Sequence, residues 1–284
     1  MTTFVWGAVL GAALLHALWN SVVKSAGDKF MSAARVAMWT GVVAAFVGLV
    51  TPAPLAASLP YVIASALIHV AYFLLVGRLY RDADLSVAYP MMRGLAPLVA
   101  TALAAATLRE IPDAVALAGV LALVAGVATM GFSGLAHGRI NRVTLVVALF
   151  NSVIIAVYSV VDGEGARLAG PGAAHAFAYN AWSDALTAAL YLPVVLALRG
   201  QAAGPELVRD PLRSGFAGLA AFGGYAIVVW AMTQASIGAV AALRECSVAF
   251  AAIIGVAFLG EPFRGARAGA ALLIVGGAIA LRLA

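Results

Sequence analysis

The chain has 284 residues, of which 64% are hydrophobic and only 10% are charged, with a mean hydropathy of +1.03. A typical soluble domain is about 45–50% apolar and about 25% charged, so this composition excludes an ordinary soluble protein and indicates an integral membrane protein. The net charge of +5 lies in short loops, where membrane topology accounts for it better than a nucleic-acid partner does. A single cysteine, Cys246, excludes an intramolecular disulfide.

The chain opens with an apolar segment, Phe4 to Val23, that lacks the basic start and the small-residue cleavage pattern of a signal peptide. It is about 20 residues long, enough to span a bilayer, and we interpret it as a retained first helix. Charged and Pro/Gly-rich breaks divide the whole chain into ten such spans. Their ranges are 3–23, 31–51, 60–79, 86–107, 113–133, 143–161, 175–198, 214–234, 236–259 and 265–283. The predicted fold class is therefore all-α integral membrane, with ten transmembrane helices and no soluble domain.

Positive charges are distributed unevenly among the predicted loops. Loops after odd-numbered spans hold twelve Lys and Arg residues, whereas loops after even-numbered spans and the C-terminal end hold Arg109, Arg167 and Arg282. The positive-inside rule then predicts that the odd-numbered loops are cytoplasmic and that both termini lie outside. We expect a multi-pass protein of the cell (inner) membrane.

The sequence also repeats itself at a shift of 151 positions. Arg93 then aligns with Arg244 and Glu110 with Glu261, together with weaker matches between apolar residues and glycines. Because five spans separate the aligned residues, the two halves would cross the membrane in opposite directions, as in many secondary transporters. We expect two inverted-topology five-helix repeats, residues 1–138 and 139–284. The alternative is a chance register between similar apolar helices.

Two segments carry a family resemblance. They are LLHALWNSVVKS, Leu14 to Ser25 in the first span, and LGEPFRGARAGAALLIVGG, Leu259 to Gly277, which runs into the last span. Together with the ten-span plan, they resemble the EamA-type members of the drug/metabolite transporter superfamily, and the likeness extends over essentially the whole chain. Within that group the chain is similar to aromatic amino-acid exporters. The first-half counterpart of Leu-Gly-Glu departs from the pattern, because Arg109 stands where glycine is usual.

This resemblance implies a carrier of small organic solutes, commonly an exporter of amino acids or related metabolites, that works by alternating access. The four-helix relatives that exchange protons for cationic drugs rely on a glutamate in the first helix. Here the first span holds no acidic residue, only His16. The proton-for-drug mechanism is therefore not transferred to this chain.

Two arginines stand inside predicted spans, Arg93 in the fourth and Arg244 in the ninth. A charge at the bilayer centre costs about 2.5–3.5 kcal/mol on insertion scales and normally faces a cavity or a partner. The planar guanidinium suits a carboxylate, so we expect one of them to bind the carboxylate of an amino acid or organic acid. The alternative is a structural role in orienting helices, with Arg93 paired to Asp184 or Glu245.

Arg93 stands in the stretch AYPMMRGLAP, between Pro90 and Pro97 and beside Gly94. Each proline removes a backbone hydrogen bond, so an interrupted helix is expected here. An interrupted helix at membrane depth is tolerated where it is buried in protein or lines water. Tyr89 shares a helix face with Arg93 and joins the candidate site. The alternative is that proline is simply more frequent in membrane helices.

Other polar and aromatic side chains within the spans complete the predicted substrate site. Asp184 is a candidate acceptor for a substrate ammonium or a coupling proton, or else a structural partner for an arginine. His16 and His69 are candidate proton-linked switches, or else neutral histidines hydrogen-bonded within the bundle. The aromatic residues would line a cavity, or else only pack. The candidate substrate-binding residues are Arg93, Arg244, Tyr89, His16, Trp19, Asn20, His69, Tyr72, Tyr158, Trp182, Asp184 and Tyr225.

Some residues are assigned to the membrane interface and to packing instead. Trp6, Tyr80 and Tyr191 are predicted interface anchors. Glycines in the eighth and tenth spans are predicted to allow close helix packing. These glycines are Gly218, Gly223, Gly224, Gly269, Gly276 and Gly277.

The sequence contains no convincing catalytic, metal-binding or ATP-binding pattern. We therefore expect a non-enzyme without a cofactor, with a small-molecule substrate and the lipid bilayer as partners, no nucleic acid, and a monomeric state. The leading hypothesis is a secondary transporter that moves amino acids or related small carboxylate-bearing metabolites, as an exporter, around a central cavity. The alternatives are an exporter of cationic drugs or other metabolites, a membrane enzyme, and a non-transporting scaffold.

Overall fold

The structure, a computed structural model, describes residues 1–82, 85–132, 142–259 and 265–284, and in these ranges it consists of helices and turns without a β-strand. The helices are α1 (Thr3–Lys24), α2 (Lys29–Val50), the 3-10 helix η1 (Ala56–Ser58), α3 (Leu59–Asp82), α4 (Leu85–Gly94), α5 (Ala96–Leu108), α6 (Ala114–Phe132), α7 (Arg142–Leu168), α8 (Ala173–Arg199), α9 (Ala203–Leu207), α10 (Pro211–Met232), α11 (Ile237–Arg244), α12 (Cys246–Leu259) and α13 (Gly265–Leu283).

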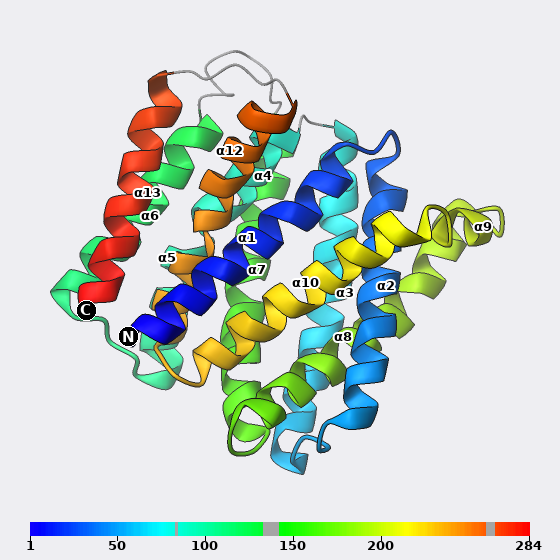
Figure 1. The fold of residues 1–284 in the computed structure, drawn as a ribbon, viewed down its shortest axis with the longest axis horizontal. Helices are drawn as coiled ribbons and strands as arrows, with labels where there is room; N and C mark the ends of the chain where they lie inside the picture. Colours follow the sequence, from blue (N-terminus) through cyan, green and yellow to red (C-terminus); the bar gives the residue numbers. More distant parts are fainter. Residues whose placement is uncertain (83–84, 133–141, 260–264) are drawn as a thin grey trace.

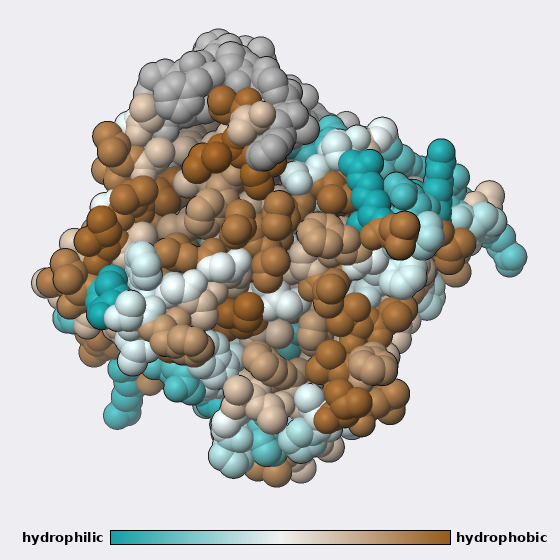
Figure 2. All heavy atoms as spheres, viewed as in Figure 1, coloured by the Kyte–Doolittle hydropathy of each residue, from teal (hydrophilic) through white to brown (hydrophobic). Residues whose placement is uncertain are grey.

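Among the described residues, eight helical segments are long and apolar enough to cross a membrane. Two shorter apolar helices, Ala114–Met130 and Ala268–Leu283, accompany them. Together these segments correspond to the ten predicted spans, and the all-α integral membrane fold class is confirmed. The outer surface agrees with this class, because large apolar side chains such as Leu49 (85% exposed) and Phe46 (68%) face outward. Figure 2 shows apolar residues over most of one face, with hydrophilic residues at the end of the bundle near α9 and along the opposite edge.

Local sequence signals define several helix ends. Thr2 and Asp28 cap α1 and α2, since their side-chain oxygens accept hydrogen bonds from the backbone N–H groups of Val5 and Met31. Asp113 acts in the same way before α6 and accepts from the N–H of Ala116 at 2.7 Å. Such side-chain caps are expected at helix N-termini, because the first N–H groups of a helix have no acceptor within the helix.

The fourth and ninth predicted spans are each built from two helices, and each interruption lies within two residues of an arginine. In the fourth span, α4 ends at Gly94 and α5 begins at Ala96, with Pro97 in its first turn. The expected interruption is present, but Pro90 lies inside α4 and does not end it. The predicted span 236–259 is present, and the structure divides it into α11 (Ile237–Arg244) and α12 (Cys246–Leu259). The N–H of Glu245 donates to the carbonyl of Ala242, three residues back, which ends α11.

Two further boundaries differ from the prediction. The predicted seventh span, 175–198, matches α8 closely. The predicted sixth span ended at residue 161, whereas the corresponding helix α7 runs on to Leu168. Asp162 and Glu164 ended the predicted span because charged residues are costly in lipid, yet Asp162 is buried within the bundle. The loop predicted between Arg199 and Arg213 contains the short helix α9, which packs Ala203 and Leu207 onto α2 and α8.

Corresponding helices of the two predicted halves make corresponding contacts. By span order, α1, α2, α3 and α6 of the first half correspond to α7, α8, α10 and α13 of the second. α6 packs on its counterpart α13, and α2 packs on its counterpart α8. The contact of α1 with α10 is matched by the contact of α7 with α3. Figure 1 shows α1 and α10 side by side across one face of the bundle and α6 beside α13 at its edge. The two chain ends are adjacent, since Arg282 donates to the carbonyl of Met1 at 3.2 Å and Trp6 Nε1 donates to the carbonyl of Ala278 at 2.8 Å. These packed helices surround an interior that contains both intramembrane arginines.

Candidate functional site

Arg93 is wholly buried and is held by a two-point ion pair. Its Nε and Nη2 donate to Oε2 and Oε1 of Glu245 at 2.6 and 2.7 Å. Its Nη1 lies 3.0 Å from Nε2 of His16. The two-point geometry is the strong form of an arginine–carboxylate contact. It joins the α4–α5 interruption to the α11–α12 interruption, and of the two partners considered from the sequence, Glu245 rather than Asp184 pairs with Arg93.

Arg244 is also buried, at 2% exposure, but its contacts are weaker. Its Nε lies 3.8 Å from Oε1 of Glu245, and among the described residues no hydrogen-bond acceptor serves this nitrogen. The guanidinium lies over the rings of Tyr158 and Tyr225, 5.7 and 5.8 Å from their centroids, within the range of a cation–π contact. A buried donor without an acceptor carries an unfavourable desolvation cost. An anion at this position would remove that cost.

Arg244 lines a partly open cavity of about 80 Å³ between α1, α2, α3, α7, α8, α10 and α11. We call it the inner cavity. Eight of the twelve predicted site residues line it: His16, Trp19, His69, Tyr72, Tyr158, Asp184, Tyr225 and Arg244. This volume is well below the roughly 300–1,000 Å³ of a pocket for drug-sized ligands. In this conformation the cavity suits a small solute better than a large one.

The remaining four predicted site residues lie elsewhere or are not described. Arg93 lies behind the inner cavity in its ion pair, and Asn20 is buried and donates to the carbonyl of His16 at 2.8 Å. Trp182 is 42% exposed and lies on the outer surface of α8. The side chain of Tyr89 lies outside the described residues.

One predicted interface anchor was wrong. Tyr191 is wholly buried and its ring stacks on that of Phe73 at 5.1 Å between centroids. Trp182, by contrast, lies in the middle of a span but faces outward. Sequence position along a span does not tell which side of the helix is turned inward.

His16 is surrounded by hydrogen-bond donors. Its Nδ1 lies 3.2 Å from Nε1 of Trp19, and its Nε2 lies 3.0 Å from Nη1 of Arg93. Indole and guanidinium nitrogens are donors only, whereas a neutral imidazole offers one donor and one acceptor. One of these two contacts therefore brings donor to donor. Arg244 lines the same cavity, so His16 lies between two arginine side chains.

Carboxylates approach the inner cavity from α7 and α8. Asp184 lines the cavity and accepts a hydrogen bond from Nδ2 of Asn180 at 3.0 Å. Asp162 is buried at 1% exposure and accepts from the hydroxyls of Tyr179, at 3.0 Å, and Tyr225. The sequence analysis missed Asp162 because it placed that residue beyond the end of a span. Its four-residue spacing from Tyr158 was the available signal, since residues at that spacing share a helix face.

His69 and the tyrosines form an aromatic wall of the inner cavity. The His69 ring stacks on Tyr158 at 4.4 Å and meets the edge of Tyr225 at 5.6 Å. Its Nδ1 lies 3.0 Å from the carbonyl oxygen of Ser65, whose hydroxyl accepts from Ser183 at 2.7 Å. The wall is thus fixed by hydrogen bonds from α3 to α8, and it can pack against the apolar part of a solute.

The repeat motif has a separate structural role outside the inner cavity. Glu110 accepts a hydrogen bond from the N–H of Ile237, at the start of α11, at 2.8 Å. Its other oxygen lies 2.5 Å from Nη1 of Arg167. The Nε of Arg167 donates to the carbonyl of Met232 at 3.0 Å. A carboxylate at a helix N-terminus is favourable. Glu110 therefore ties α5 to α7 and α11. The aligned Glu261 lies outside the described residues.

A helical membrane bundle with two interrupted helices, charged side chains near both interruptions and a cavity beside them is an arrangement typical of membrane carriers. The family model described as EamA-like transporter family matches residues 142–283. The chain belongs to this family, within the drug/metabolite transporter superfamily, and is a multi-pass membrane transporter for a small molecule.

Comparison with solved structures extends this result to the fold of the whole chain. A structure titled "Crystal structure of protein" is 21% identical, has a TM-score of 0.74, and covers 100% of this chain and 98% of that chain. At this identity the likeness concerns the fold alone. No curated protein matches the chain.

Proposed function

We propose that this transporter moves amino acids or related small carboxylate-bearing metabolites, as an exporter, by alternating access around the inner cavity. The single observation that carries the proposal is the buried Nε of Arg244, which lines the cavity and has no acceptor among the described residues. A substrate carboxylate would supply that acceptor, and a guanidinium binds a carboxylate through two parallel hydrogen bonds.

Two arginines then have different roles in the proposed mechanism. Arg244 binds the substrate carboxylate, while Arg93 fixes the two helix interruptions through Glu245. Asp184 lines the same cavity from α8 and is the proposed acceptor for the substrate ammonium. The aromatic wall of His69, Tyr158 and Tyr225 would contact the rest of the solute. A guanidinium and a carboxyl group that line one cavity match the two polar ends of an amino acid.

We further propose that residues 1–138 and 139–284 are two five-helix repeats of opposite topology. The matching contacts of α6 with α13, and of α1 with α10 and α3 with α7, support this division. The interruptions after Arg93 and Arg244, which align in the sequence repeat, also support it. Alternating access would then be a movement of the two repeats about a shared site. We propose a monomer in the inner membrane, with the loops after odd-numbered spans in the cytoplasm.

The test is counterflow in liposomes that contain the purified transporter, with radiolabelled amino acids, organic acids and cationic dyes. We expect saturable flux of at least one carboxylate-bearing solute, and a loss of about tenfold or more in apparent affinity for Arg244→Gln, since a charged hydrogen bond contributes about 1.5–3 kcal/mol. Arg244→Lys keeps the charge but loses the planar fork, so intermediate affinity is expected. Arg209→Gln, at an exposed position, serves as the control.

Flux of the dyes alone, with equal rates in the parent and Arg244→Gln proteins, would contradict the carboxylate proposal. That result would favour the alternative of a cationic-drug exporter, in which Asp184 and Asp162 would attract the cation. Absence of flux for every solute tested would leave the substrate class without support.

A further inference from the structure

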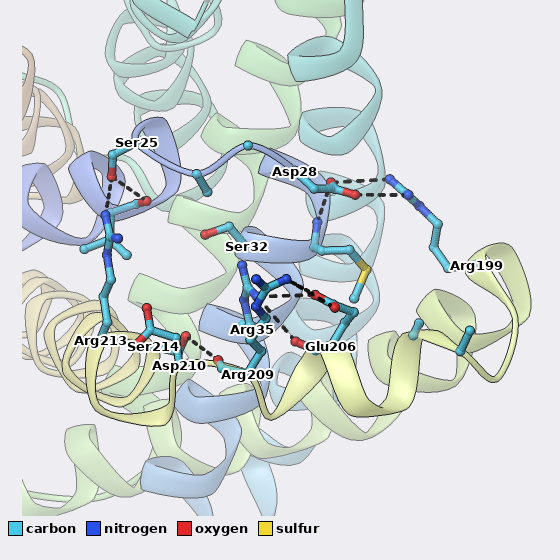
Figure 3. A pocket seen from close by; sticks show the side chains of 16 residues that line it. Ser25, Asp28, Ser32, Arg35, Arg199, Glu206, Arg209, Asp210, Arg213 and Ser214 are labelled. Atoms are coloured by element: carbon cyan, nitrogen blue, oxygen red, sulfur yellow. Dashed lines mark hydrogen bonds and ion pairs between the residues drawn. The ribbon is translucent and has the colours of Figure 1, made fainter.

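A second, larger cavity of about 560 Å³ lies at one end of the bundle. We call it the outer cavity. It is formed where α1 ends and α2 begins, together with the end of α8, the short helix α9 and the start of α10 (Figure 3). Four arginines and three acidic residues line it, with hydroxyls of three serines. No part of the substrate site described above includes these residues.

Three of the four arginines have close partners. Arg199 Nη1 lies 3.1 Å from Asp28, Arg209 Nη1 lies 3.4 Å from both carboxylate oxygens of Glu206, and Arg213 donates to the hydroxyl of Ser25 at 2.5 Å. The Asp28 and Ser25 contacts join the ends of α8 and α10 to the α1–α2 corner. These three arginines therefore account for much of the acidic and hydroxyl lining.

Arg35 is different, because it is only slightly exposed and weakly bound. Its side chain is 14% exposed, and in the described part of the chain its contacts are the carbonyl of Glu206, at 3.4 Å, and the Glu206 carboxylate, at 3.8 Å. Both distances involve Nη1 alone. A guanidinium has five N–H donors in a planar fork, so most of the donors of Arg35 have no protein acceptor in this part of the chain. Figure 3 shows Arg35 in the middle of the outer cavity, between Ser32 and Glu206.

The outer cavity lies directly beyond the inner cavity along the same helices. Four helices line both cavities: α1, α2, α8 and α10. On α2, Ser32 and Arg35 line the outer cavity, whereas Val36 and Thr40 line the inner cavity. Each helical residue rises about 1.5 Å, so Arg35 stands at the boundary between the two. A solute that approaches the inner cavity along α2 would meet Arg35 first.

We propose that the outer cavity is a second binding site for a small carboxylate solute, with Arg35 as its anchor. The carboxylate would bind the planar fork of Arg35 in place of its long contact with Glu206, and the buried hydroxyl of Ser32 stands one turn away on α2. The inference rests on the proposed function for the class of solute. The site itself is argued from the donors of Arg35 and from the shape of the cavity.

Binding at this site can be measured without transport. Ala202 lines the outer cavity and is exposed, so Ala202→Cys, in a background where the buried Cys246 is replaced by Ser, gives one position for an environment-sensitive fluorophore. The purified, full-length protein in neutral detergent is titrated with potassium acetate and with L-alanine. Potassium chloride at equal ionic strength corrects for screening, and potassium phosphate tests a different oxyanion.

We expect a saturable fluorescence change with acetate or alanine, and an apparent affinity at least about tenfold weaker in Arg35→Gln, since a charged hydrogen bond contributes about 1.5–3 kcal/mol. Arg209→Gln is the matched control, because Arg209 lines the same cavity but is 70% exposed and already paired. The control is expected to bind as the parent does. The same titration in Arg244→Gln is expected to remain saturable, because the inner site is separate.

Several outcomes would overturn the inference. They are a change that never saturates, saturation unaffected by Arg35→Gln, saturation with phosphate alone, and loss of saturation in Arg244→Gln, which would place the signal at the inner cavity. The titration and the counterflow experiment can fail separately, so the two proposals are distinguishable. If counterflow fails but the titration saturates as expected, the carrier mechanism for carboxylates is contradicted and the outer site is retained. If counterflow succeeds but the titration fails, only the outer site is contradicted.

Discussion

Arg93 and Arg244 have the same side chain, nearly the same burial and aligned places in the two halves, yet their surroundings differ. Glu245 binds Arg93 through both carboxylate oxygens and lies 3.8 Å from Nε of Arg244. One carboxylate thus serves two cations unequally. This inequality separates the proposed structural role of Arg93 from the proposed binding role of Arg244, because a fully bonded guanidinium has less to offer a substrate.

The first prediction concerns this ion pair. Arg93→Gln and Glu245→Gln are each expected to destabilise the fold by about 3–5 kcal/mol, because removing one partner leaves the other charge buried and uncompensated. Melting temperature in detergent measures the effect. The double substitution is expected to recover part of the loss, since neither member of the Arg93–Glu245 pair then carries an uncompensated charge. Arg209→Gln breaks an exposed pair and should cost about 0–1 kcal/mol. Equal, small shifts for all variants would show that the pair does not hold the helix interruptions together.

At the scale of the helix, the interruption of the ninth span depends on a neighbouring element. α11 has only eight residues, and its first N–H group is bonded by Glu110 from the end of α5. Arg167 supports the same corner from α7 through Glu110 and the carbonyls of Met232 and Ala235. The position of Arg244, at the end of α11, therefore depends on contacts at the other end of that helix.

The second prediction follows from this corner. Glu110→Gln keeps the size of the side chain but removes the charge that Arg167 and the α11 N-terminus both favour, so a loss of about 1–2 kcal/mol is expected. Thermal unfolding measures it. Asp113→Asn is the control three residues away, because asparagine caps a helix about as well as aspartate. If both variants melt alike, the bond from Glu110 to α11 contributes no stability.

Close packing of α6 and α13 provides the third prediction. A Cβ atom on Gly277 would stand 2.7 Å from the carbonyl oxygen of Gly119 and 2.9 Å from the backbone nitrogen of Leu123, whereas one on Gly276 would meet nothing within 4 Å. Gly277→Ala is expected to destabilise by about 1–3 kcal/mol through overpacking. Gly276→Ala is expected to be neutral or slightly stabilising, because alanine is the better helix former. A thermal melt of the two variants compares neighbouring glycines directly, and an unchanged Gly277→Ala protein would show that the helices can separate without cost.

At the scale of the whole molecule, orientation follows from charge and gives the fourth prediction. Cys246 is buried, so single cysteines at new positions can be labelled selectively in its presence. In intact cells, a membrane-impermeant maleimide is expected to label Ile111→Cys, in the loop after the fourth span. Ala202→Cys, in the loop after the seventh span, is expected to react only after lysis. The opposite labelling pattern would reverse the assigned topology. Labelling of both cysteines in intact cells would contradict the prediction that the two loops lie on opposite sides of the membrane.

The orientation also decides which side the outer cavity faces. With the proposed topology, the outer cavity opens to the cytoplasm, where an exporter would collect its substrate. The reversed topology would place Arg35 on the far side, where it would act in release or uptake. The binding experiment on Arg35 does not depend on this choice.

Hydropathy alone determined the ten spans and the fold class, because lipid requires an apolar surface and a helix that satisfies its own backbone hydrogen bonds. The aligned arginines also directed attention to the interior, since a charge in a span needs a cavity or a partner. Eight predicted site residues do line one cavity. Rare polar residues are informative in an apolar chain, because few positions can hold them.

Only the tertiary structure decided which partner each polar residue has. Glu245 rather than Asp184 binds Arg93, Tyr191 faces inward and Trp182 outward, and Asp162 lies within the bundle. The outer cavity at Arg35 is built from segments more than 160 residues apart in the chain. Local hydropathy cannot determine such pairings, because the sequence of one helix does not specify which neighbouring helix each of its faces contacts. That information arises when the helices pack.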